Sequence, residues 1–222
     1  MSRWEWWEKP LGLGLWLVIT LITIYSVFAW FDQGGHYNRV ILVGGLGSLA
    51  FAIPLLLRFT QRMIVPWPLI LLIFASLFNH LMGDFLNFYT IYPWFDKVSH
   101  FLSSFTVAVI VLLFLVLVSH YIRSIQIPVR LMPWLTLATV GMLGVIWEIF
   151  EWFAGFIGVE MQFYLEDTVY DLVTNFIGAM ISSYLGYRYV LKNGVEKIAL
   201  SLEVDDFMNF VAEKWEKRMG VL

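Results

Sequence analysis

Four clusters of acidic, histidine and polar side chains interrupt an otherwise apolar sequence. Within each cluster the key residues recur three or four positions apart, a spacing that places side chains on one face of an α-helix. Carboxylates and imidazoles on such faces can bind a divalent cation, relay protons or act as a general acid–base pair. The clusters are Asn79, His80, Asp84 and Asn87; Asp96, His100, Ser103 and Ser104; Glu148 and Glu151; and Asp167, Asp171 and Asn175.

The helices that must carry these clusters are long enough to cross a bilayer. Of the 222 residues, 60% are hydrophobic and only 14% are charged, whereas about a quarter are charged in an ordinary soluble domain. A membrane-spanning helix needs about 20 apolar residues. The sequence therefore predicts an all-α, polytopic integral membrane protein with six transmembrane helices. The predicted spans are about 11–31, 39–58, 67–90, 97–120, 132–157 and 168–190.

The end of the chain has a different pattern. We expect residues 1–200 to form one transmembrane domain and residues 201–222 to form a cytoplasmic amphipathic tail. Val204, Phe207 and Val211 recur at helical spacing, with acidic residues near the start of this stretch and basic residues near its end. That order of charges suits the helix dipole, and it predicts a helix that lies on the membrane surface or docks on the bundle.

Basic residues are distributed unevenly about the six predicted spans. Of the 14 Lys and Arg residues, all but Arg39 and Lys97 fall on one side. The positive-inside rule places that side in the cytoplasm. We therefore expect a multi-pass protein of the cell membrane with both termini in the cytoplasm.

Composition excludes several classes of function. The chain has no cysteine, so disulfides, thiolate metal sites, iron–sulfur clusters and cysteine nucleophiles are ruled out. Its high apolar content rules out a nucleic-acid-binding domain. The partner that it predicts is the lipid bilayer.

With this topology all four polar clusters lie in the outer half of the membrane. A carboxylate there costs about 2.5–3.5 kcal/mol on insertion scales, so we expect the clusters to face one partly wet cavity rather than lipid. A divalent metal ion of unknown identity would offset the repulsion between the acids. The residues expected to act in catalysis are His100, Glu148, Glu151 and Asp171. Those expected as metal ligands are the same four together with Asp167, Asp84 and His80. Those expected to bind substrate are Asn175, Ser103, Ser104 and Asn87.

The order of the motifs resembles that of a known group of membrane proteins. The motifs are Asp96-Lys97-x-x-His100-Phe101, Glu148-x-x-Glu151-Trp152 and Asp167-x-x-x-Asp171-x-x-x-Asn175-x-x-Gly178. In this order they resemble the YjdF-like membrane proteins and, more distantly, the VanZ-like family, whose bacterial members include a teicoplanin-resistance protein. The resemblance covers roughly residues 67–190 and implies a site without naming a reaction. The chain departs from the VanZ-like pattern in its second glutamate and in the additional pair of His80 and Asp84.

Three functions remain open on the sequence. The first is a metal-assisted enzyme that acts on a lipid or lipid-linked substrate at the outer leaflet. The second is a cation- or proton-coupled transporter, since the outer half is strongly acidic. The third is a lipid-binding or assembly factor whose polar residues are purely structural. On this last reading His80 and Asp84 form an interhelical pair, and Asp96 and Asp167 cap their helices.

Overall fold

The computed structural model describes residues 7–33, 37–60, 63–156, 159 and 165–220, and over these residues the regular structure is entirely helical. Most of the chain is taken up by long helices, with short helices at two turns and at the C-terminal end. The elements are α1 (Glu8–Gln33), α2 (Tyr37–Phe59), α3 (Trp67–Phe85), α4 (Phe88–Ile91), α5 (Pro93–Tyr121), the 3-10 helix η1 (Val129–Leu131), α6 (Met132–Phe156), α7 (Leu165–Asn193), α8 (Val195–Ser201) and α9 (Asp205–Arg218).

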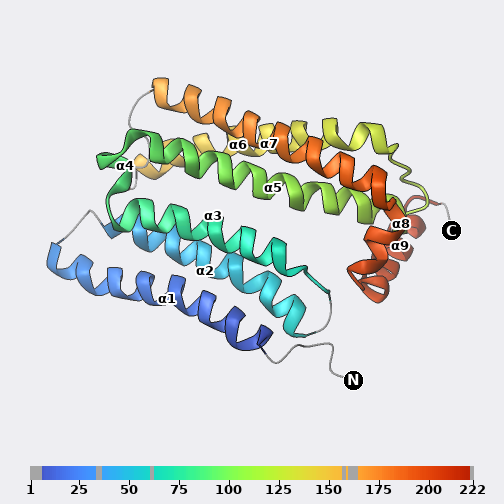
Figure 1. Ribbon diagram of the computed structural model, residues 1–222, viewed down its shortest axis with the longest axis horizontal. Coiled ribbons are helices and arrows are strands. Elements are labelled where there is room, and N and C mark those ends of the chain that lie inside the picture. Colours follow the sequence, from blue (N-terminus) through green and yellow to red (C-terminus); the bar gives the residue numbers. More distant parts are fainter. Residues whose placement is uncertain (1–6, 34–36, 61–62, 157–158, 160–164, 221–222) are drawn as a thin grey trace.

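The long helices form two groups that lie side by side (Figure 1). Helices α1, α2 and α3 pack together in one group, helices α5, α6 and α7 in the other, and α3 packs on α5 to join them. Helix α4 lies at one end of this bundle. The start of α1 and helices α8 and α9 lie at the opposite end (Figure 1).

Each group has its own apolar core. Phe51 and Ile70, both fully buried, fill the space between α2 and α3. Val116 of α5 and Met132 of α6 are also fully buried, and Ile198 of α8 joins them. Leu113 of α5 packs against both cores and so links the two groups, whereas at the α4 end the groups meet through polar side chains.

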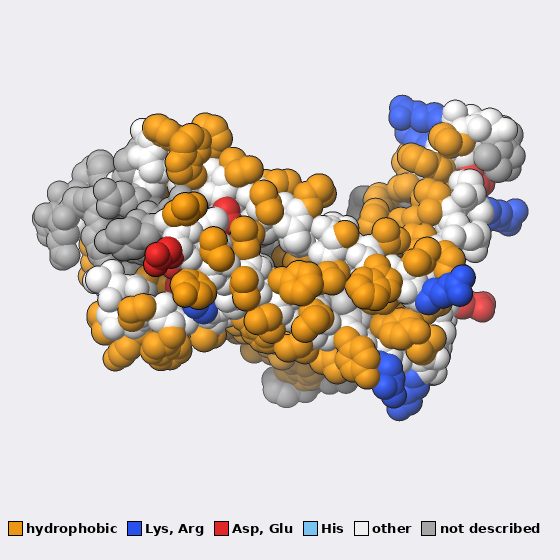
Figure 2. Space-filling view, turned by 90° about the horizontal axis from the view of Figure 1, so that it is seen from above, with side chains coloured by type: hydrophobic (Ala, Val, Ile, Leu, Met, Phe, Trp, Pro, Cys, Tyr) orange, Lys and Arg blue, Asp and Glu red, His pale blue; other side chains and the backbone are white. Residues whose placement is uncertain are grey.

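Within the part of the chain that the structure describes, five helices have the length and apolar composition of membrane spans, which confirms a multi-pass helical membrane protein. The candidate spans are Glu8–Ala29, Tyr37–Phe59, Trp67–Phe85, Pro93–Tyr121 and Val129–Phe156. Helix α7 has 29 residues but is more polar and is not among them. A broad band of hydrophobic side chains covers the middle of the face seen in Figure 2, and blue Lys and Arg side chains gather toward the end that carries α8 and α9.

The third predicted span, 67–90, is wrong at its C-terminal end. Helix α3 stops at Phe85, and Asn87 adopts a left-handed conformation with φ of 57°. Asparagine is one of the few residues that tolerate this conformation, which ends a helix. A short helix α4 follows, and α5 begins at Pro93 rather than at 97, because proline suits the first turn of a helix.

In the predicted C-terminal segment the structure has one helix, α9, and a short helix that was not predicted, α8, precedes it. Helix α8 ends at Ser201, Glu203 has a positive φ of 48°, and α9 follows from Asp205. Helix α9 docks on the bundle: Tyr121 donates a 2.9 Å hydrogen bond to Asp205, and the buried Glu216 accepts one from the backbone of the turn after α5.

Helices α5 and α7 approach closely, as small residues in α7 allow. A methyl group added at Gly178 would collide with Ser104 and with the backbone carbonyl oxygen of Phe101. One turn later, Ser182 donates a 2.9 Å hydrogen bond to the carbonyl of Phe105. This contact fixes the distance between the polar residues that α5 and α7 carry at the α4 end.

Candidate functional site

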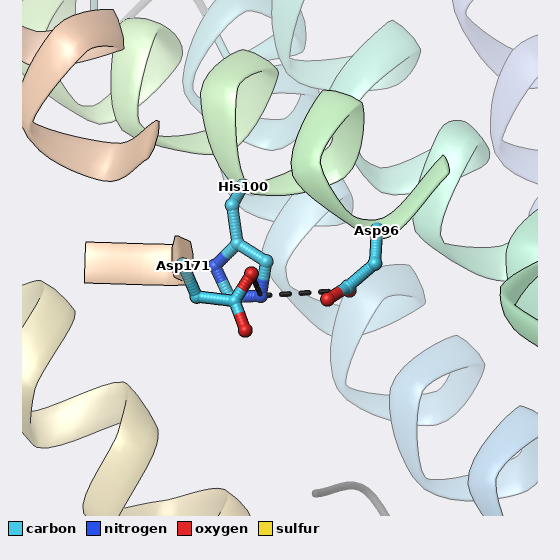
Figure 3. Close-up of side chains that lie close together, drawn as sticks. All are labelled: Asp96, His100 and Asp171. Carbon is cyan, nitrogen blue, oxygen red and sulfur yellow. Dashed lines mark ion pairs between the residues drawn. The ribbon is translucent and has the colours of Figure 1, made fainter. Parts of the chain in front are cut away.

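His100 lies at the centre of the polar site. It is 3% exposed and projects from the second turn of α5. Its Nε2 atom is 3.6 Å from an oxygen of Asp96, one turn earlier, and 3.6 Å from an oxygen of Asp171 on α7. In Figure 3 both carboxylates are directed at the same nitrogen of the His100 ring. The four-residue spacing in α5 and the close α5–α7 packing together produce this arrangement.

Lys97 compensates the charge of the aspartates. Its ammonium group lies 3.0 Å from Asp96, 2.5 Å from Asp167 and 2.6 Å from Asp171. One cation thus holds three carboxylates, two of them on α7. This side of the site has an internal counter-charge.

The two glutamates of α6 complete the site on the other side of His100. Glu148 and Glu151 are 5% and 7% exposed. Glu151 accepts a 2.9 Å hydrogen bond from the indole N–H of Trp147, one turn away. Both carboxylate oxygens of Glu148 are buried, and neither makes a well-aligned hydrogen bond among the described residues, although the Thr168 hydroxyl of α7 lies close by. Within the described part of the chain, neither glutamate is ion-paired with a Lys or Arg side chain.

Two groups of side chains in this site have the geometry to hold a metal ion. One is Asp96, His100 and Asp171, and the other is His100, Glu148 and Glu151; in each, the ligand atoms lie within 4.8 Å of one another. Ligands bonded at about 2.0–2.2 Å stand at most about 4.4 Å apart across an ion, so small side-chain rotations suffice. The glutamate group fits a cation better, because Lys97 already occupies the carboxylates of the aspartate group.

A hydrogen-bonded chain of neutral groups adjoins this site. His80 Nδ1 lies 2.9 Å from the Tyr89 hydroxyl, and His80 Nε2 lies 2.9 Å from the Ser103 hydroxyl. Ser103 continues to Ser76 at 3.0 Å. The rings of His80 and His100 are 6.2 Å apart. His80 is therefore a neighbour of the candidate metal site, with both ring nitrogens engaged elsewhere.

Asp84 belongs to a separate ion pair. Its carboxylate lies 2.9 Å from the guanidinium of Arg39 on α2, and the side chain is 4% exposed. The guanidinium also lies 5.1 Å from the centre of the Tyr89 ring. Asp84 is therefore paired with Arg39. The pair of Asp84 with His80 that the sequence suggested does not form among the described residues, in which both lie on α3.

The residues expected to bind substrate lie in different surroundings. Asn175 is 7% exposed and lies against His100. Ser103 is bound to His80, and Ser104 donates to the Phe101 carbonyl beside Gly178. Asn87 lies in the turn before α4 and accepts a hydrogen bond from Thr90. Of these four, Asn175 is the one whose polar side chain is directed at a residue of the candidate metal groups, His100, in the described part of the chain.

Four residues that shape the site were not among those expected to act in it: Arg39, Tyr89, Lys97 and Trp147. The sequence could have pointed to two of them. Arg39 and Lys97 are the two basic residues that lie on the acidic side of the predicted spans, apart from the other twelve. Tyr89 and Trp147 resemble the other aromatic residues of the chain, and only the fold brings their polar atoms to His80 and Glu151.

These features define a class, that of polytopic helical membrane proteins with a buried acidic and histidine site. The chain belongs to the family described as predicted membrane protein (DUF2238), whose model matches residues 14–192. The matched region contains the whole candidate site. Comparisons with curated proteins and with solved structures found no match.

Proposed function

We propose that this protein binds a divalent cation through His100, Glu148 and Glu151, and that the cation assists a reaction on a lipid or lipid-linked substrate. The observation that carries the proposal is the environment of Glu148. A carboxylate buried in a membrane protein is costly unless a cation or hydrogen-bond donors compensate it. Among the described residues Glu148 has no Lys or Arg partner, and the Thr168 hydroxyl on α7 is the one donor close to it. It also lies beside a second glutamate and a histidine.

The donor set narrows the choice of cation. One imidazole and two carboxylates suit Zn²⁺, Mn²⁺ or Fe²⁺ better than Ca²⁺ or Mg²⁺, which prefer oxygen ligands alone. A cation held by three protein ligands keeps positions open for water or substrate. Such an ion activates bound water or polarises a phosphoryl oxygen. Lys97 would hold Asp171 and Asp167 in place beside it, with Asp171 near enough to His100 to orient the imidazole.

The proposed topology places this site toward the outer leaflet. We propose that α7 also crosses the bilayer, as a sixth span, and that both termini lie in the cytoplasm. Its 29 residues correspond to about 43 Å of helix, which exceeds the hydrocarbon thickness. Its polar residues Asp171 and Asn175 are buried inside the bundle. We also infer a relation to the YjdF-like and VanZ-like proteins, supported by the motif order within the residues that the family model matches.

The chain is well suited to a test of this topology, because it has no cysteine. Single cysteines introduced as Glu166→Cys and Lys192→Cys mark the two ends of α7. In intact cells a membrane-impermeant thiol reagent should label the first and not the second. Equal labelling of both would contradict a sixth span.

The cation proposal is tested by metal analysis of the purified protein, prepared without chelators, beside Glu148→Gln and Glu151→Gln. The expected result is one metal ion per chain in the parent and its loss in both variants. The exposed Glu166 offers a matched control, since Glu166→Gln should retain the metal. A parent that neither contains metal nor binds added Zn²⁺ or Mn²⁺ would contradict the proposal.

Proton-coupled transport is the second candidate, and the chain from Tyr89 through His80 and Ser103 to Ser76 supports it. Hydroxyl and imidazole groups both donate and accept protons, so a line of them can relay a proton. Protein reconstituted in liposomes should then carry a proton flux that His80→Phe removes. No flux, together with full metal occupancy, would favour the enzyme.

A further inference from the structure

Helix α9 crosses an end of the bundle that is rich in Lys and Arg side chains (Figures 1 and 2). Tyr121, the last residue of the candidate span Pro93–Tyr121, donates its hydrogen bond to Asp205 at the start of α9. Glu216, near the other end of α9, accepts a hydrogen bond from the backbone N–H of Arg123. Both ends of α9 are therefore held at the level where α5 leaves the apolar layer, which in a bilayer is the headgroup region.

One face of α9 is fixed against the bundle. Met208, Ala212 and Glu216 recur every four residues and are buried. Met208 joins the apolar core around Val116 and Met132. The rotation of α9 about its own axis is therefore set, and its exposed faces point away from the bundle.

An exposed face of α9 combines aromatic and basic side chains. Its members recur at intervals of three and four residues and so form one stripe along the helix. This aromatic–basic stripe consists of Phe207, Phe210, Lys214 and Arg218, all of them exposed. Within it, the ammonium group of Lys214 lies 4.5 Å from the centre of the Phe210 ring.

The acidic residues of α9 lie outside the aromatic–basic stripe. Asp205 and Glu216 accept the hydrogen bonds that dock the helix on the bundle, and Glu213 is paired with Lys217. At 3.6 residues per turn, these three acids and Asp206 fall on a separate arc of about 100°. The stripe therefore carries positive charge only, although α9 as a whole has more acidic than basic residues.

We propose that the aromatic–basic stripe binds the membrane surface around the bundle and selects anionic phospholipid. Phe207 and Phe210, each more than half exposed, insert at the level of the headgroups. Lys214 and Arg218 extend their alkyl stems over the apolar layer and contact lipid phosphates. Each basic residue near an anionic surface contributes roughly a fivefold factor to binding. The proposal goes beyond the metal site and does not depend on it.

Anionic lipid fits the aromatic–basic stripe better than a protein partner does. Lysine is depleted at interfaces between proteins, whereas aromatic and basic side chains together are typical of helices that lie in the membrane plane. The level at which Tyr121 and Arg123 hold α9 also places the stripe beside lipid.

The absence of cysteine from the chain allows a test with single spin labels. Phe207→Cys places a label in the stripe and leaves Phe210 in position, and Asn209→Cys places one on the acidic arc as the control. The full-length protein is reconstituted in vesicles of phosphatidylcholine, with or without phosphatidylglycerol. The label at 207 should be more accessible to oxygen than to a water-soluble nickel chelate, and the label at 209 should show the reverse. Phosphatidylglycerol should lower the nickel accessibility at 207 severalfold further.

Charge selectivity is tested with the label at position 207. Lys214→Gln should reduce the further decrease that phosphatidylglycerol causes, and the addition of Arg218→Gln should abolish it. Lys217→Gln, which removes a positive charge outside the stripe, should retain it.

Three results would overturn the proposal. Equal nickel accessibility at positions 207 and 209 would exclude the membrane contact. A label at 207 that is shielded from oxygen as well as from nickel would indicate a protein partner instead. The same nickel accessibility with and without phosphatidylglycerol would exclude the selection of anionic lipid.

Discussion

Lys97 and Asp171 are 74 residues apart in the chain, and their charged groups lie 2.6 Å from each other. The contact joins α5 to α7 beside His100. It also divides the buried acids into two sets, because the aspartates share a lysine whereas Glu148 and Glu151 have no described basic partner. The placement of one lysine therefore decides which carboxylates remain for a cation.

Replacing Lys97 should strengthen metal binding while it weakens the metal-free protein. In Lys97→Gln the three aspartates lose their counter-charge, so the site becomes more negative. At an effective dielectric of about 20, removal of a unit charge roughly 6–8 Å from the ion changes the interaction by about 2–3 kcal/mol per ionic charge. We expect at least a tenfold lower dissociation constant for Mn²⁺ and a lower melting temperature without metal.

Lys97→Arg provides the control, since it keeps the charge and should leave both quantities near the parent values. Calorimetric titration and thermal unfolding in detergent measure them. Weaker metal binding in Lys97→Gln, with the fold intact, would contradict this expectation and show that the lysine is needed to position the metal ligands.

Replacing Glu148 should have opposite effects on stability with and without metal. Exchange of a buried ion pair for apolar residues of similar volume is often neutral or stabilising by about 1–4 kcal/mol, and removal of a buried carboxylate that has no basic partner should act in the same direction. Metal-free Glu148→Met should therefore unfold at a higher temperature than the metal-free parent. Added metal at 100 times its dissociation constant would stabilise the parent by about 2.7 kcal/mol and the variant not at all.

The exposed acid at position 166 separates this effect from a general loss of negative charge. Glu166→Met should follow the parent in both conditions. A metal-free Glu148→Met that is markedly less stable than the parent would indicate that Glu148 has a structural partner.

The Arg39–Asp84 ion pair should contribute to the stability of the fold and should not affect the affinity for the metal. Removal of one member of a buried ion pair costs about 3–5 kcal/mol, because the other charge is left uncompensated. Asp84→Asn and Arg39→Met should each destabilise the protein by that order, and the double variant Arg39→Met with Asp84→Leu should recover most of the loss. Metal affinity should stay within about threefold in any of these that folds. Loss of metal in the double variant would place Asp84 among the ligands.

The sequence predicts a helix well where hydropathy alone determines its position. It predicts less well where a turn or a tertiary contact determines the end of the helix. Long apolar runs gave the helical membrane class and most helix positions. The break at Asn87 could not be seen, because the residues on both sides remain apolar. The short helix α8 was not predicted, although a boundary near residue 200 was; the positive φ of Glu203 that separates α8 from α9 is unusual for a glutamate and depends on the surrounding contacts.

For the candidate site, helical spacing indicated which residues share a face but not which faces meet. The faces of His100, Glu148 and Asp171 do meet, as expected from their common depth. Asp84 does not join this group, because it forms an ion pair with Arg39. Arg39 lies on another helix, so the spacing of residues along one helix could not predict this contact. Whether these residues bind metal stays a prediction, which the variants above test.

The α5–α7 contact offers a last test, because it sets the distance between His100 and Asp171. At Gly178 an added Cβ atom would lie 2.6 Å from the Phe101 carbonyl oxygen, and backbone cannot rotate away as a side chain can. Overpacking of this kind costs about 1–3 kcal/mol. Gly178→Ala should lower the melting temperature and, by separating the helices, weaken metal binding. Gly141→Ala on α6 is the control, since the added methyl group meets no described atom within 4 Å and alanine favours the helix. Equal behaviour of the two variants would mean that the two helices are not held at the separation the structure gives them.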